Sequence, residues 1–338
     1  MLTEELVRRQ TEAIEKKGAG DLWVFSNGLV NQLQLTRFAH EVLSWAESGR
    51  RALPAGLGGR PQSYSDATIL VTLLVMTVWQ LSPETMVKRM KRWDELALAC
   101  GYVPGQVISA SQLRRRRERL GLWVYFVTLC LLVFTLIQKG VITGRDWVID
   151  STTIDAFSRQ DGEAGWSFTG RFGYKVHMLI CRDSLLPIVF LVSPANANDG
   201  PWAPRLMAMA HALFNLPVQV VRADAAYYTK AVLAFIVEVL GATPKVVFNP
   251  RRTGKTALVT LQWVAEFRTD KGKRGYIERL FAVLKRYYRL NNLSCSSLWH
   301  AYRHAFEICF AVLLTAWLAH DLGRPDLAHA RSRLLAPC

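Results

Sequence analysis

Two apolar runs rich in β-branched residues, YKVHMLI (174–180) and LPIVFLV (186–192), are separated by only the five residues CRDSL. Runs of this length and composition are typical of β-strands, and so short a connection joins antiparallel neighbours. We therefore predict that residues 174–192 form a β-hairpin. This hairpin decides the fold class, because the segments around it must complete its sheet.

Further strand-like runs lie on both sides of the hairpin, and helical periodicity fills the intervals after it. The resulting order, β-β-β-α-β-α-β-α, predicts an α/β domain in which helices cover a mixed sheet. The additional strands are expected at WVID (147–150), PVQVVRAD (217–224) and PKVVFN (244–249), and the helices at 200–215, 228–240, 274–290 and 297–320.

The chain before residue 145 has a helical pattern throughout, and breaks such as PAGLGGRP and YVPGQ separate its helices. We predict an all-α N-terminal domain at 1–145, the α/β domain at 146–322 and a C-terminal tail at 323–338. The N-terminal helices are expected at 32–49, 64–80, 83–99, 109–120 and 122–138.

The chain is strongly basic, with 42 Lys and Arg against 27 Asp and Glu and a formal net charge of +15. Such a surplus indicates a polyanionic partner, most often nucleic acid. In SASQLRRRRERLG (109–121), Ser109 or Ser111 can cap a helix whose surface carries Arg114, Arg115, Arg116 and Arg117. Together with 83–99 this helix could form a DNA-binding helix-turn-helix, and a solvated basic face without a target is an equal alternative.

Two apolar runs raise the alternative of a polytopic membrane protein. LWVYFVTLCLLVFTLI (122–137) and ILVTLLVMTVWQL (69–81) are both shorter than the roughly 18 to 20 residues of a membrane span, so we expect buried core helices and no membrane partner. The charged N-terminus does not resemble a signal peptide, and the six cysteines show neither zinc-type nor disulfide-type spacing. These features predict a cytoplasmic protein.

Two of the strand-like runs end in an aspartate, Asp150 in WVID and Asp224 in PVQVVRAD. Each alone could be a turn former or a helix cap, but the carboxyl ends of parallel strands meet at one ligand-binding edge of a covered sheet. Converging carboxylates repel one another unless cations neutralise them, and Mg²⁺ prefers carboxylate oxygens. Two Mg²⁺ ions roughly 3.5–4 Å apart can activate the attacking oxygen and stabilise the leaving oxygen in phosphodiester transfer.

A third acid, Glu278, stands alone in the basic segment KRGYIERLFAVLKRYYRL (273–290). On a helix, Arg274, Glu278 and Lys285 share one stripe opposite an apolar face. Intrahelical salt bridges would explain this arrangement by themselves. If the helix packs on the sheet, Glu278 instead completes the acidic site, and its cationic neighbours hold the DNA strand.

This series of motifs resembles the ribonuclease-H-like DDE transposases of bacterial insertion sequences, in the groups named for insertion sequences four and five. VIDSTTIDA resembles their first-Asp motif, GYKVHMLICRDSLLPIVFLVSPANANDG the hairpin after it, and VVRADAAYY the second-Asp motif. The spacing Arg274-x3-Glu278-x6-Lys285 matches the third motif. Lys271 replaces its leading tyrosine, and the gap before Glu278 is too short for the large β insertion of some members. The resemblance covers about 145–320, with a looser echo in RPQSYSDATILVTLLVMTVWQLS.

The resemblance implies that Asp150, Asp224 and Glu278 bind two Mg²⁺ ions, for which Mn²⁺ substitutes. It also implies DNA contacts by Arg274, Lys285 and Lys175. His177 and Asp199 occupy recurrent polar positions of the family without an assignable role, although a strand histidine more often faces solvent than binds a ligand.

The function implied is binding of the terminal inverted repeats of an insertion sequence, followed by strand cleavage and strand transfer. Its partners would be double-stranded DNA, both element ends and target, and a second copy of the chain in a synaptic complex at the bacterial nucleoid. The alternative is a catalytically inactive relative that binds DNA without cutting it.

Overall fold

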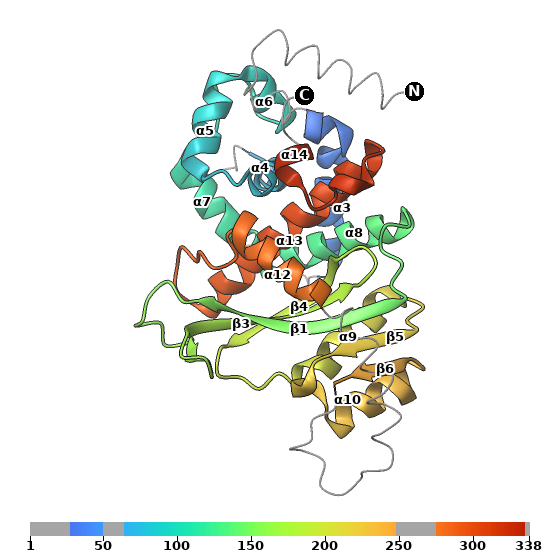
Figure 1. The fold of residues 1–338 in the computed structure, drawn as a ribbon. Helices are drawn as coiled ribbons and strands as arrows, with labels where there is room; N and C mark the ends of the chain where they lie inside the picture. The colour runs from blue at the N-terminus through green and yellow to red at the C-terminus, as the bar shows by residue number, and fades with distance from the viewer. Residues whose placement is uncertain (1–27, 50–63, 248–274, 335–338) are drawn as a thin grey trace, which may run out of the picture. The chain divides into compact units, whose positions relative to one another are not determined.

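The computed structural model describes residues 28–49, 64–247 and 275–334 of the 338-residue chain (Figure 1). The chain divides into two compact units: Met1–Leu132 with Phe306–Cys338, and Val133–Ala305. The predicted boundaries at 1–145 and 146–322 differ from these units, because the segment from Phe306 onwards belongs to the N-terminal unit. Residues 323–334 are not a separate tail within the structure, because the Arg331 guanidinium donates to the Val78 carbonyl of the first unit at 2.6 Å.

The described part of the first unit is helical, as the periodicity predicts, and its core consists of aliphatic and aromatic side chains. Its N- and C-terminal segments are in contact, because Phe38 packs edge-to-face on Trp317 at 5.9 Å between ring centroids. Its helices are α3 (Leu35–Ser48), α4 (Asp66–Trp79), α5 (Pro83–Arg92), α6 (Asp94–Ala99), α7 (Ala110–Arg119) and α14 (Arg331–Leu334), and both α8 (Gly121–Gln138) and α13 (Leu298–Asp321) contribute residues to it.

The prediction of one helix over 83–99 is wrong, because the chain breaks at Trp93, whose backbone is extended. Arg89, Lys91 and Arg92 occupy the last turn of α5, whereas Asp94 and Glu95 occupy the first turn of α6. Cations at a helix C-terminus and acids at a helix N-terminus interact favourably with the helix dipole, so these charges favour two short helices over one continuous helix.

The second unit contains a six-stranded mixed sheet (Figure 1). The predicted hairpin is confirmed: β3 (Phe172–Cys181) pairs antiparallel with β4 (Leu186–Pro194). On its other edge β3 pairs antiparallel with the central strand β1 (Asp146–Asp155), which pairs in parallel with β5 (Val220–Ala223). β5 pairs in parallel with β6 (Thr243–Val246), and the unpredicted two-residue strand β2 (Gly165–Trp166) pairs with the start of β3.

The expectation that the first strand ends at Asp150 is wrong, since β1 continues to Asp155. What ends near Asp150 is the parallel pairing with β5, whose last paired residues are Ile149 and Ala223. The segment read from the sequence as a turn, Ser151 to Thr153, remains in the antiparallel ladder with β3. Its β-branched residues pack well on a pleated surface, which favours a strand over a turn.

Helices cover both faces of the sheet (Figure 1). On one face α12 (Gly275–Tyr287) packs against β1 through the buried residues Ile277, Leu280, Phe281 and Leu284. On the other face α9 (Trp202–Phe214) packs against β3 and β4, and the short α10 (Lys230–Ala234) contacts α9. The predicted mixed sheet flanked by helices is therefore confirmed, and it leaves the polar residues of β1 between two helical layers.

Within the described ranges, α8 is the only unbroken helix that is long and apolar enough to cross a membrane, and α4 with α5 meets the same criteria only as a pair bent by 106°. α8 reaches 18 residues, so the expectation that this run is too short for a span is wrong on length alone. A buried core helix has the same length and hydropathy. Tyr125, Leu129, Leu132 and Leu136 of α8 are core residues.

Candidate functional site

Asp150 and Asp224 lie side by side just beyond the parallel pairing of β1 with β5. Since Ile149 is opposite Ala223 in the parallel register, the next residue of each strand is the aspartate. Neighbouring strands are about 4.8 Å apart, so the register brings the two backbones together at one edge position. Both carboxylates are oriented by main-chain amides: Asp150 Oδ1 accepts from Ser151 N at 2.7 Å, and Asp224 Oδ1 accepts from Ala226 N at 2.9 Å.

The buried side chain of Tyr227 is near enough to this pair of carboxylates for their charges to act on its hydroxyl. Asp224 caps the short 3₁₀ helix η1 (Ala225–Tyr227), and this turn brings the tyrosine ring back towards the aspartates, where it is 1% exposed. Burial raises the pKa of the Tyr227 hydroxyl far above its usual value, and the negative charges of Asp150, Asp199 and Asp224 raise this pKa further. The hydroxyl therefore keeps its proton and is available as a donor among three acids.

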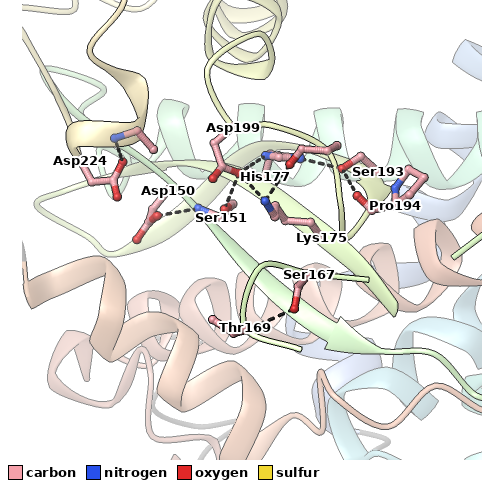
Figure 2. A network of polar contacts seen from close by, with 12 residues as sticks. Asp150, Ser151, Ser167, Thr169, Lys175, His177, Ser193, Pro194, Asp199 and Asp224 are labelled. Atoms are coloured by element: carbon pink, nitrogen blue, oxygen red, sulfur yellow. Dashed lines mark hydrogen bonds and ion pairs between the residues drawn. The ribbon is translucent and has the colours of Figure 1, made fainter. Parts of the chain in front are cut away.

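Asp199, in the segment that leads into α9, joins residues of β1 and β3 (Figure 2). Its Oδ1 atom accepts from Ser151 Oγ at 2.8 Å and lies 3.1 Å from Lys175 Nζ and 3.4 Å from His177 Nδ1. Lys175 also donates to the Ala197 carbonyl at 2.8 Å. The network attaches Ser151, the residue after Asp150, to the hairpin and to the segment that leads into α9.

His177 is fully buried, so the expectation of a solvent-facing strand histidine is wrong. Its ring stacks on Trp202 at 4.9 Å between centroids, and its Nε2 lies 2.8 Å from Ser193 Oγ. Burial lowers the pKa of His177 to about 4, with the charge of Lys175 acting in the same direction and that of Asp199 opposing it. The imidazole is therefore neutral at pH 7.

This burial predicts a pH-dependent stability. Between pH 6.5 and 4 the unfolded chain takes up a proton on His177 that the folded chain does not, so stability falls as the pH falls through this window. His177→Gln should reduce that loss, as measured by urea unfolding at pH 7.5 and pH 5. The control is His40→Gln, which replaces an exposed histidine of α3. Equal losses in the wild-type protein and in His177→Gln would contradict the burial of a neutral imidazole.

The helix α12 carries the third predicted acid and one of its predicted cations. Glu278 is exposed in the first turn of α12, and Arg274 lies outside the described residues. Lys285 is partly buried near Asp155 and Arg171. Desolvation lowers its pKa, and the positive charge of Arg171 lowers this pKa further. Arg171 holds Asp155 through two bonds of 2.9 and 2.7 Å, so the carboxylate whose charge acts on Lys285 is already paired.

The described residues include no group of three His, Cys, Asp or Glu side chains close enough to hold a metal ion, so the predicted three-carboxylate cage is not assembled in this structure. The two aspartates nevertheless fit a hard divalent cation by their chemistry, because carboxylate oxygens are the ligands that Mg²⁺ prefers. Two carboxylates beside a buried tyrosine hydroxyl also form an acidic position that a cation would neutralise.

The predicted arginine surface of α7 proves to be mostly engaged within its own unit. Of the two predicted caps, Ser109 and Ser111, Ser109 caps the helix and forms a capping box with Gln112. Arg114 pairs with Glu84, and Arg116 is buried, donating to Asp66 Oδ1 at 2.5 Å and to the Tyr64 carbonyl at 2.9 Å. Arg117 binds Glu307, with Nε at 2.7 Å from Oε1. Arg115 is exposed. Because Arg116 is buried, the prediction that all four arginines lie on the surface of the helix is wrong.

Sequence reasoning overlooked Tyr227 and Ser151 as parts of the site. Both belong to the motifs quoted above: Ser151 directly follows Asp150, and Tyr227 is three residues after Asp224. The available signal was the spacing of Tyr227, because a residue three positions after a capping aspartate is about one helical turn away and can fold back towards it.

Comparison with known proteins identifies the segment that carries these residues. The family model described as Transposase DDE domain matches residues 144–314, which include Asp150, Asp224, Glu278 and Lys285. A cryo-EM structure of the piggyBac transposase synaptic complex with hairpin DNA is similar over 93% of this chain and 80% of that chain, with 10% sequence identity and a TM-score of 0.46. None of the curated proteins compared matches the chain. The family match spans half of the chain, and the protein belongs to the transposase DDE-domain family.

Proposed function

We propose that this chain is the transposase of a bacterial insertion sequence of the groups named for insertion sequences four and five. It binds the terminal inverted repeats of its element and catalyses metal-dependent strand cleavage and strand transfer through a ribonuclease-H-like domain. Two copies hold the two element ends in a synaptic complex at the nucleoid, and double-stranded DNA is both donor and target.

The observation that carries this proposal is the register of β1 and β5. It sets Asp150 and Asp224 next to each other at the edge where the parallel pairing ends, inside the segment that matches the family. Acids at such a strand-end position face the crevice where α/β sheets bind their ligands. A purely structural role does not explain two adjacent carboxylates well, because their mutual repulsion destabilises the fold unless a cation is bound.

We assign Asp150 and Asp224 as ligands of divalent ions, Mg²⁺ with Mn²⁺ as a substitute. When bound, such ions polarise the phosphate and stabilise the charge that develops on the attacking and leaving oxygens. The protein orients the ligands: main-chain amides fix one oxygen of each aspartate, and Asp199 holds the strand at Ser151. The Tyr227 hydroxyl, which keeps its proton, can donate to a carboxylate and fix its orientation.

Glu278 is proposed as the third acid because of the direction of α12. Lys285 lies near Asp155 at the far end of β1, and α12 packs along this strand. Glu278 is seven residues earlier on the helix, about 10 Å at 1.5 Å per residue. Asp150 is five residues before Asp155, about 17 Å along the strand. Ser151 lies opposite His177, which stacks on Trp202 of α9, so alternation along β1 puts Asp150 on the other face, the one that α12 covers. Asp155 alternates to the α9 face but stands at the exposed end of the strand.

The test is cleavage of DNA from the element itself. The purified full-length protein is incubated with Mg²⁺ and a fragment containing the DNA that brackets its reading frame. We expect cuts at the outer ends of short inverted repeats, strand-transfer products, and no reaction in EDTA. Binding of the repeats without any cut, in Mg²⁺ and in Mn²⁺, would support the inactive DNA-binding relative instead.

Substitutions of two arginines of α7 should have different effects, one on DNA affinity and one on stability. Arg115→Ala should leave stability unchanged and lower the slope of log affinity against log salt by about 0.9, because an exposed cation that contacts one phosphate is lost. Arg116→Ala should destabilise the fold by about 3 kcal/mol, because Asp66 and the Tyr64 carbonyl lose a buried cationic partner. Filter binding at four salt concentrations and thermal unfolding measure the two effects. An unchanged slope for Arg115→Ala would assign Arg115 to a solvated face.

A further inference from the structure

The connection between β1 and β3, residues 156–171, exposes large aromatic side chains. Phe168 is fully exposed, Phe157 is 61% exposed and Trp166 is 54% exposed. These are three of the twelve exposed large hydrophobic side chains in the described part of the chain. The burial of each of these aromatic surfaces would be favourable, and three such side chains within one connection indicate a binding surface.

The connection is held firmly although its aromatic tips are exposed. The buried Asp161 carboxylate accepts from the Tyr174 hydroxyl at 2.7 Å and from the Ser297 amide at 3.0 Å. Glu163 accepts from the Leu298 amide at 2.7 Å. Because these anchors fix the backbone in advance, a ligand that stacks on the aromatic rings does not have to pay for ordering the loop.

An arginine side chain lies beside one of the exposed rings. The Arg159 guanidinium lies 5.8 Å from the centre of the Trp166 ring. Arg171, the last residue of the connection, is paired with Asp155, and both charges act on Lys285. The other two acids of the connection, Asp161 and Glu163, accept hydrogen bonds from main-chain amides. A ligand with flat rings and a repeated negative charge would satisfy both the aromatic and the cationic groups.

We propose that Phe157, Trp166 and Phe168 form a stacking platform for the bases of single-stranded DNA, with Arg159 beside Trp166 to neutralise a phosphate. Base stacking on aromatic side chains is strong and tolerant of sequence, and arginine beside an aromatic ring adds a cation–π contribution. Bases in a duplex are covered on both faces, so the platform selects unpaired strands.

The platform deepens the proposed function and rests on it for the source of the strand, which is the DNA end next to the cut. β1 leads directly from Asp150 to the start of the connection. The five residues from Asp150 to Asp155 span about 17 Å, which corresponds to about five nucleotides at about 3.4 Å each. An unpaired end held by the platform would thus extend a few nucleotides from the paired aspartates.

The test compares two fluorescein-labelled probes in EDTA, so that no cleavage occurs: a 15-nucleotide oligo(dT) and a 15-unit strand of abasic sites with the same phosphates. The wild-type protein should bind oligo(dT) more tightly than the abasic strand. Phe168→Leu and Trp166→Leu keep an apolar side chain but remove the aromatic face. Each should weaken oligo(dT) binding at least about fivefold, the lower end for one stacked base, and change abasic binding less than about twofold.

The controls separate stacking from other causes. Trp45→Leu replaces a tryptophan of α3 that is 60% exposed and should change neither affinity. Phe168→Trp should retain oligo(dT) binding, and circular dichroism verifies the fold of each variant.

Three results would overturn the platform: unchanged oligo(dT) binding by Phe168→Leu and Trp166→Leu, equal losses on both probes, or variants that lose self-association but keep the preference for bases. The last result would make the surface a contact between copies. Failure of element-end cleavage with an intact preference for bases would instead reject the proposed function alone.

Discussion

Asp150→Asn and Asp224→Asn are each expected to lower the rate of DNA cleavage on the order of 10³-fold or more while leaving DNA affinity within a few fold. The two carboxylates occupy adjacent positions in the register of β1 and β5, so either substitution leaves one acid where the proposed ions need two. Removing a group that stabilises transition-state charge typically costs 10² to 10³ in rate, and removing a residue that would hold a metal ion should cost more. Affinity comes mainly from phosphate contacts and should persist.

Asparagine is chosen because its amide oxygen can still accept from Ser151 N or Ala226 N, so the local backbone bonds survive. Cleavage is measured in a single turnover at saturating protein, and affinity by fluorescence anisotropy in Ca²⁺. Asp183→Asn, an exposed acid at the hairpin turn, is the matched control and should cleave normally. Glu278→Gln tests the third position by the same assay. A variant that cleaves near the wild-type rate would exclude its residue from the site.

Lys285→Ala is expected to give the second large effect, a loss of about 100-fold in the cleavage step with little change in affinity. The partial burial of Lys285 beside Arg171 and Asp155 fixes its position at the end of β1. A phosphate held there, about five nucleotides from the paired aspartates, would fix the path of the DNA strand into the site, and small errors of position can reduce a rate about 100-fold.

A stability measurement distinguishes this role from a structural one. The lowered pKa of Lys285 means that the folded protein disfavours its charge, so Lys285→Ala should not reduce the free energy of unfolding. Single-turnover cleavage with DNA bound first and Mg²⁺ added last measures the rate. Lys245→Ala, a cation on β6, is the control. A rate for Lys285→Ala within twofold of wild type would leave intrahelical salt bridging as the better account of this helix face.

Local sequence patterns were sufficient to predict the secondary-structure elements and the fold class. The hairpin, the amphipathic helix around Glu278 and the capped helix after Ser109 all follow from short-range periods and capping residues, which act over a few residues in any context. The same patterns pointed to Asp150 and Asp224, because an acid after an apolar strand is visible without the structure. The family's segment was recognisable for the same reason, since its motifs are local.

Which of these side chains meet depends on the tertiary fold and cannot be read from local patterns. The parallel register places Asp150 beside Asp224, and the fold of the hairpin buries His177 against Trp202 and collects Ser151 and Lys175 around Asp199. It also turned Arg116 inwards to Asp66, 50 residues away, although its neighbours in the sequence are equally basic. Long-range pairings depend on register and packing between distant segments, and no local period encodes them.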